Sequence, residues 1–167
     1  MAHVHGGEPD WLHGHAHDPN PKAPSPDPDF TLRLPGGQEQ QITLADLHTL
    51  PLTTVPDCLI VSTGHGASGP FEFAGVRLRD LVAAYLPPAL EWHYADAISA
   101  DGFGNRIFAH ELSDGAATNP ILLAHTIDGI AMTRAQGLVR LIVPSETDDA
   151  LRQVKWLARV EIHTHGE

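Results

Sequence analysis

Short apolar segments, each bounded by turn-forming residues, recur along most of this chain and leave little room for long helices. Several of them alternate apolar and polar residues, as half-buried strands do. Asp101-Gly102 and Asp128-Gly129 lie between such segments and are typical of tight turns between strands. The expected strands lie at 30–34, 40–44, 58–62, 94–100, 105–109, 121–125, 138–143 and 157–163.

Helices are predicted to be few and short. Thr43 is suited to cap a helix over 44–50. Apolar residues at helical spacing predict a second helix over 76–85, which Pro87 and the proline after it would end. Residues 150–155 are expected to form a short helix or a turn. Many short strands with a few short helices predict an α+β fold with mixed sheets.

The first 29 residues differ from the rest of the chain. They are dense in proline and histidine, so they are expected to form an extended, mobile tail. The remaining length suits one domain, and the 42% share of hydrophobic residues is ordinary for a globular protein. We therefore expect a tail over 1–29 and one cofactor-binding domain over 30–165.

The net charge of −11 argues against nucleic acid and anionic membranes as partners. No apolar run is long enough to span a bilayer, so membrane insertion is not expected. The N-terminus lacks the basic start and apolar stretch of a secretory signal. The sequence as written therefore suggests a cytoplasmic protein, or a periplasmic or secreted one if a leader was removed. Cys58 is the only cysteine, which excludes an internal disulfide.

A glycine-rich stretch at 63–70 follows the strand predicted at 58–62. Glycines allow backbone N–H groups to approach a ligand closely. A flexible connection between two strands is the alternative interpretation. The residues that could contact a ligand here are Ser62, Thr63, Gly64, His65 and Gly66.

A cluster of basic residues near the C-terminus is the second candidate site. Its members are Arg134, Arg140, Arg152, Lys155 and Arg159. Arg152 and Lys155 are three residues apart and would share a face on a helical turn, where they would suit a phosphate. Surface ion pairing with Glu146, Asp148 and Asp149 is the alternative. Elsewhere, Arg106 directly follows a predicted turn and could reach a neighbouring cleft.

Histidines of the tail are candidate metal ligands. They alternate with other residues, so in an extended chain each group of imidazoles lies on one side. Imidazole suits zinc, copper and nickel. The alternative is a solvated tail with weak, unspecific affinity. These residues are His3, His5, His13, His15 and His17. Cys58 lies within an apolar run and is expected in the core, and the scattered histidines His48, His93, His110 and His125 are expected to be structural.

Four motifs, in matching order over about residues 30–163, resemble the sulfite oxidase family. They are Phe73-Ala-Gly-Val-Arg-Leu-Arg-Asp-Leu-Val, Ser99-Ala-Asp-Gly-Phe, Gly137-Leu-Val-Arg-Leu-Ile-Val-Pro and Arg152-Gln-Val-Lys-Trp-Leu. The resemblance implies that family's molybdopterin-binding fold and a pterin or molybdopterin cofactor. It also implies that Arg152 and Lys155 contact the phosphate, that Arg106 contacts the pterin, and that the Ser62–Gly66 segment lies near the metal or ring end.

This chain departs from the family at the position of the metal-ligating cysteine, where it has Ser62 and Thr63. A hydroxyl is a harder ligand than a thiolate, so sulfite oxidation is not expected. Three functions therefore stay open: binding of a pterin or molybdopterin, a small molybdenum oxidoreductase in which Ser62 or solvent replaces the thiolate, and a metal-handling or scaffold protein that acts through its histidine tail.

Overall fold

Two β-sheets make up most of the computed structural model, which describes residues 28–62, 66–112, 120–133, 135–143 and 153–165. The first sheet has the strand order β2-β1-β10-β5-β6. Its strands are β1 (Phe30–Arg33), β2 (Glu39–Ile42), β5 (Tyr94–Ser99), β6 (Gly104–Phe108) and β10 (Leu157–His163). Strands β1 and β10 are parallel and the other pairs antiparallel, so this sheet is mixed as predicted.

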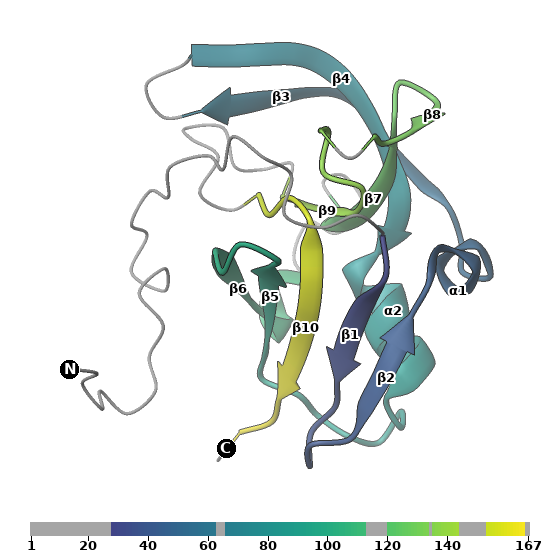
Figure 1. Cartoon of the computed structure of the whole chain (residues 1–167). Coiled ribbons are helices and arrows are strands. Elements are labelled where there is room, and N and C mark those ends of the chain that lie inside the picture. Colours follow the sequence, from purple (N-terminus) through teal and green to yellow (C-terminus); the bar gives the residue numbers. More distant parts are fainter. Residues whose placement is uncertain (1–27, 63–65, 113–119, 134, 144–152, 166–167) are drawn as a thin grey trace.

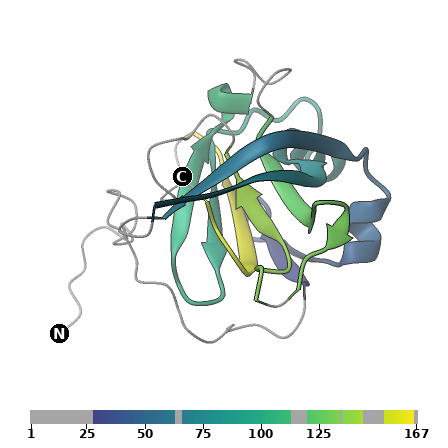
Figure 2. The ribbon, with the colours of Figure 1, turned by 90° about the horizontal axis from the view of Figure 1, so that it is seen from above.

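The second sheet has the order β3-β4-β7-β8, with β9 also paired to β7. Its strands are β3 (Thr53–Ser62), β4 (Gly66–Arg77), β7 (Leu122–Ile127), β8 (Ile130–Ala131) and β9 (Arg140–Ile142). The long hairpin of β3 and β4 lies across the top of the molecule, over β7 and β9 (Figures 1 and 2). Val55 and Phe73 of this hairpin pack against apolar side chains of β7 and β9. They form a second, smaller apolar core at this end of the molecule.

Short helices complete the fold. Helix α1 (Leu44–His48) has the predicted cap: Thr43 Oγ1 accepts from Asp46 N at 3.2 Å, while Asp46 Oδ2 accepts from Thr43 N at 2.9 Å. Helix α2 (Leu78–Tyr85) and the 3₁₀ helix η2 (Ala109–Leu112) follow. The α2 side chains Leu78, Leu81 and Val82 are buried in the larger core with the inner faces of β1, β5 and β10.

Several predicted boundaries move in the structure. Helix α2 begins at Leu78 rather than Val76, because β4 continues to Arg77 in pairing with β7. The glycine-rich stretch is a strand from Gly66 onward, paired to β3 by the register Ser62↔Gly66, so the predicted loop over 66–70 is wrong. The predicted strand over 138–143 is shorter, because Leu138 has a φ of +61°.

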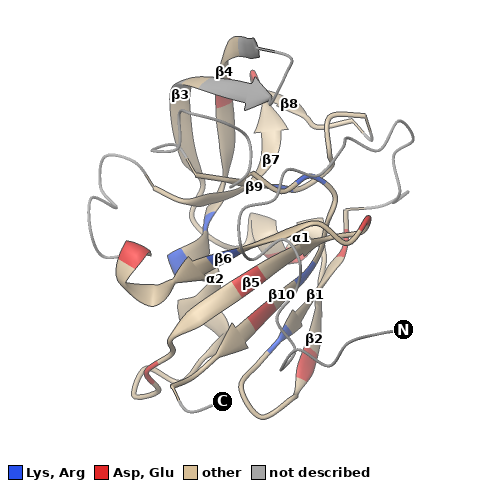
Figure 3. Ribbon diagram, turned by 90° about the vertical axis from the view of Figure 1, so that its left-hand side faces the viewer, with Lys and Arg blue, Asp and Glu red and all other residues tan. Residues whose placement is uncertain are grey.

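The outer face of the first sheet is polar. Arg159 donates to Glu39 and Glu161 at 2.9 Å each, and Arg106 pairs with Asp96 at 2.7 Å. Figure 3 shows acidic and basic positions on the strands of this sheet. Two of these ion pairs, Arg159–Glu39 and Arg106–Asp96, join different strands across this face, while the opposite face forms the core.

Candidate functional site

Two short segments near the second sheet meet to form the candidate site. The first runs from Gly137 to Arg140, and the second from Gln153 to Trp156. Trp156 N donates to Gly137 O at 3.0 Å, and Leu141 and Val154 exchange hydrogen bonds of 2.9 and 3.1 Å in an isolated antiparallel bridge. Val154 is therefore extended. The predicted helical turn that placed Arg152 and Lys155 on one face is wrong over the described residues 153–155.

Backbone strain is concentrated at this junction. Leu138 and Trp156 have φ values of +61° and +50°, a region that non-glycine side chains rarely adopt. Gly137, at +111°, lies so close to its neighbours that an added Cβ would be 2.8 Å from Arg140 Cγ and 3.2 Å from Lys155 Cγ. Such strain costs about 1–3 kcal/mol per residue and tends to gather at functional sites. The junction therefore holds Arg140 and Lys155 in a fixed position beside each other.

Arg140 is the most unusual residue of the junction. It is only 4% exposed. Its Nη2 donates to Gln153 Oε1 at 3.2 Å and its Nη1 to Gln136 O at 3.3 Å, while the guanidinium lies 5.6 Å from the centre of the Phe73 ring. Its buried Nε has no hydrogen-bond partner among the described residues. Burial lowers the pKa of Arg140 to about 10, so the side chain is still charged at neutral pH.

The Lys155 ammonium lies close enough to Arg140 that the two positive charges repel each other. Burial, and then the positive charge of Arg140, lowers the pKa of the Lys155 ammonium below its ordinary range. The Lys155 Nζ lies 5.3 Å from the centre of the Trp156 ring. No carboxylate of the described residues forms an ion pair with either cation. The acidic residues considered as alternative partners, 146, 148 and 149, lie outside the described part of the chain.

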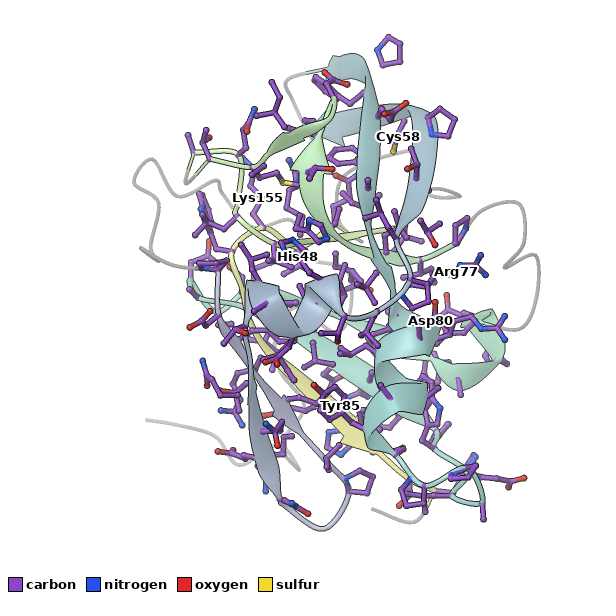
Figure 4. All side chains as sticks on the ribbon, turned by 90° about the vertical axis from the view of Figure 1, so that its right-hand side faces the viewer. His48, Cys58, Arg77, Asp80, Tyr85 and Lys155 are labelled. Carbon is purple, nitrogen blue, oxygen red and sulfur yellow. The ribbon has the colours of Figure 1, made fainter. Side chains whose placement is uncertain are left out.

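Cys58 belongs to the β3–β4 hairpin and is buried, as predicted. Burial raises the pKa of the Cys58 thiol, and the nearby charge of Arg140 opposes this rise. Figure 4 shows Cys58 on the hairpin and Lys155 on the segment that leads into β10. Register irregularities of β3 lie on both sides of Cys58, so the simple count of residues between Cys58 and Ser62 does not fix their relative placement.

Most of the other predicted site residues lie outside the described part of the chain. Ser62 and Gly66 pair with each other at the hairpin end, whereas Thr63, Gly64 and His65 lie outside the described residues. Arg152 and Arg134 also lie outside them, as do the tail histidines His3, His5, His13, His15 and His17.

Arg106 does not join the Arg140–Lys155 pair, because it contacts Asp96 and Tyr94 in the first sheet. Its Nε and Nη2 donate to the two oxygens of Asp96 at 2.7 and 3.0 Å, and its guanidinium lies 3.9 Å from the centre of the Tyr94 ring. These contacts hold Arg106 on the outer face of the first sheet, where it supports the strand pair β5–β6.

Arg140 is the residue that sequence reasoning undervalued. In the sequence it counts as a member of the basic cluster and is not among the predicted site residues. A signal was present, since Arg140 is the only charged residue in the apolar run Leu138–Val143. A charged residue in such a run either lies on the exposed face of a strand or is buried and contacts a partner group. Only the tertiary packing distinguishes these two cases.

The described residues contain neither a ready-made metal site nor a membrane-spanning helix. No group of three or more histidine, cysteine or acidic side chains within them is arranged to hold a metal ion. None of the helices formed by these residues has the length and apolar character needed to cross a membrane.

Comparison with known proteins adds a family and a fold. A family model described as "Oxidoreductase molybdopterin binding domain" matches residues 17–167. Mitochondrial sulfite oxidases of Homo sapiens and Macaca fascicularis are each 28% identical over 152 residues, covering 77% of this chain and 27% of theirs. The chain thus spans about a quarter of the length of these relatives. The crystal structure of the sulfane dehydrogenase SoxCD from Paracoccus pantotrophus aligns with a TM-score of 0.64 at 20% identity, covering 81% of this chain and 38% of that one.

Proposed function

Because the chain belongs to the oxidoreductase molybdopterin-binding domain family, we propose that it binds a pterin or molybdopterin-type cofactor through the Arg140–Lys155 pair. The buried Arg140 Nε without a partner is the observation that carries this proposal. Such a group costs about 1–3 kcal/mol, and more when it is charged, unless a ligand completes its hydrogen bonds. The resemblance seen in the sequence is confirmed by the family match.

The chemistry of the pair suits an anion. Two cations packed together in a partly desolvated site repel each other, and no described carboxylate compensates for them. A phosphate would supply two negative charges and accept hydrogen bonds from both side chains. The planar guanidinium of Arg140 would orient the phosphate, and the ammonium of Lys155 would add charge without a fixed direction. The pair thus fits the phosphate end of molybdopterin.

Other residues are proposed for the remainder of the cofactor. Arg152 precedes the junction by one residue and is proposed as a third phosphate contact. Ser62, Thr63, Gly64, His65 and Gly66 are proposed near the metal or ring end, on the basis of the sequence resemblance. Arg106 donates to both oxygens of Asp96 and so supports the pairing of β5 with β6. Its contact with the pterin stays a proposal that rests on the sequence resemblance.

Molybdenum, when bound by such a cofactor, supplies two-electron redox chemistry. The relatives are named sulfite oxidase, but this chain has Ser62 and Thr63 where the resemblance places the family's cysteine. We therefore propose that the domain does not oxidise sulfite. A sulfite-dependent reduction of an electron-acceptor dye by purified protein with stoichiometric molybdenum would favour the second candidate, a molybdenum oxidoreductase using Ser62 or solvent.

Calorimetric titration with a phosphorylated and an unphosphorylated pterin tests the binding proposal. Removal of one charge-assisted contact costs about 1.5–3 kcal/mol, or roughly tenfold to a hundredfold in affinity. Arg140→Met and Lys155→Met are each expected to weaken binding of the phosphorylated ligand by that factor, with a much smaller effect on the unphosphorylated one. Arg33→Met, on the exposed end of β1, is the matched control and should change neither.

Two outcomes would contradict the proposal. Equal losses for both ligands would show that the pair acts on the fold rather than on phosphate. Failure of the intact protein to bind either ligand would reject cofactor binding and leave the scaffold function.

A further inference from the structure

Gln153 is a buried polar residue whose side chain holds the tip of Arg140. Its Oε1 accepts from Arg140 Nη2 at 3.2 Å, and only 6% of the residue is exposed. The second acceptor is the backbone carbonyl of Gln136, 3.3 Å from Arg140 Nη1. Both acceptors are neutral, whereas a buried charged residue is usually paired with an opposite charge.

Both acceptors are fixed by the backbone around them. Gln136 N donates to Thr133 Oγ1 at 3.2 Å, and Thr133 N donates to Gln136 Oε1 at 2.9 Å, so the carbonyl belongs to a closed turn. On the other side, Gln153 directly precedes Val154, which is bridged to β9. The Arg140 guanidinium therefore has a set direction without a ligand, and its Nε is left without a partner among the described residues.

The ionisable groups of the described residues that interact with Arg140 leave the site positively charged. Burial raises the pKa of the Cys58 thiol, so this thiol is neutral at pH 7 even though Arg140 opposes the rise. Lys155 is a second cation, and burial and then Arg140 lower its pKa. The site thus presents two positive charges, and its neutral amide partner offsets neither of them.

We propose that Gln153 is a positioning residue that keeps this site selective for a dianion such as a phosphate monoester. This inference rests on the proposed function and adds a reason for the choice of ligand. A carboxylate in place of the Gln153 amide would hold the guanidinium equally well, but it would offset one of the two positive charges. The amide supplies direction without charge, so both cations remain available to the ligand. A dianion compensates both, whereas a neutral pterin compensates neither.

Gln153→Glu tests the charge, because glutamate has the shape of glutamine and can still accept from Arg140. In calorimetric titration at pH 7.5, this variant should bind a phosphorylated pterin at least about tenfold more weakly, since the new carboxylate repels the phosphate. Its affinity for the unphosphorylated pterin should change far less. Without ligand, the variant should unfold at the same or a higher urea concentration, because the carboxylate offsets two neighbouring positive charges.

Gln153→Met tests the direction, because methionine keeps the length and the neutrality and removes the acceptor. Its affinity for the phosphorylated pterin should fall by roughly twofold to tenfold, less than in Gln153→Glu. Gln41→Glu on the exposed strand β2 is the matched control: this amide also accepts from a side chain, Thr31 Oγ1 at 3.3 Å, and the net charge changes equally. The control should leave both affinities unchanged.

The results that would overturn the inference differ from those that would reject cofactor binding. Undiminished affinity of Gln153→Glu for the phosphorylated pterin would overturn the role of Gln153 and leave the proposed function intact. Equal losses for the two pterins would also overturn it, because they would mean that Gln153 only supports the fold.

If the intact protein binds neither pterin, the proposed function fails and titration with inorganic phosphate decides the inference. Phosphate should then shift the Lys155 side-chain ¹³C resonances in the native protein and much less in Gln153→Glu. Equal shifts in the two proteins, or no shift in either, would overturn it.

Discussion

Arg140→Met separates a ligand-binding charge from a structural one. Methionine keeps the unbranched stem that packs on Phe73 and removes the charge. The burial that lowers the pKa of Arg140 to about 10 costs the charged form about 3 kcal/mol. Against this stand two long hydrogen bonds, of 3.3 and 3.2 Å, together worth about 3 kcal/mol. The two contributions nearly cancel, so the ligand-free protein should change in stability by less than about 2 kcal/mol.

A buried arginine that is paired with a carboxylate behaves differently, since removing one partner typically costs about 3–5 kcal/mol. Urea unfolding followed by circular dichroism measures the difference, with Arg33→Met as the exposed control. The same variant should lose roughly tenfold to a hundredfold in affinity for a phosphorylated pterin. A loss of more than about 3 kcal/mol in the free energy of unfolding would refute the reasoning. It would mean that Arg140 stabilises the fold as an ion-pair partner and is not a binding group for an anion.

Three further substitutions test the fold. Gly75→Ala should destabilise the protein by about 3 kcal/mol or more in urea unfolding, because its Cβ would clash with the Leu123 carbonyl of β7. Thr43→Ala should cost about 1 kcal/mol in the same assay through loss of the α1 cap, and Thr43→Ser should restore it. Burial, and then His48, lower the pKa of His125, so the unfolded chain binds the proton more tightly. Stability should therefore fall as the pH drops from 7 toward 5, and His125→Gln should flatten this fall; an unchanged pH profile would show that His125 does not contribute.

Local features of the sequence predicted most elements because their causes are local. The capping pair Thr43 and Asp46 fixes the start of α1 within four residues. Asp128 and Gly129 both have positive φ, as a two-residue hairpin turn requires, and this dipeptide was recognised in the sequence. The α+β class with mixed sheets follows from such elements, and it is confirmed by the structure.

The errors arose where pairing between distant strands outweighs local composition. Gly66 to Pro70 resembles a loop in sequence, yet it extends β4 because β3 supplies hydrogen-bonding partners along its length. The sequence predicts a short helix or turn over 150–155, yet the backbone groups of Val154 bond to Leu141. In both cases the partner lies in another segment, so its position cannot be read from the residues themselves.

The family, the fold class and the presence of a basic cluster can be read from the amino-acid sequence, since these depend on residue types in a fixed order along the chain. The burial and the partners of each basic residue depend on how distant segments pack. In the sequence, spacing and the family resemblance single out Arg152 and Lys155 from the five cations. In the structure, Glu39 and Glu161 neutralise Arg159, whereas Arg140 is buried beside Lys155 and its Nε has no hydrogen-bond partner among the described residues. The physical reason is that the free-energy cost of keeping a side chain charged depends on its burial and on its nearest partners. Both are set by segments that meet only when the chain folds.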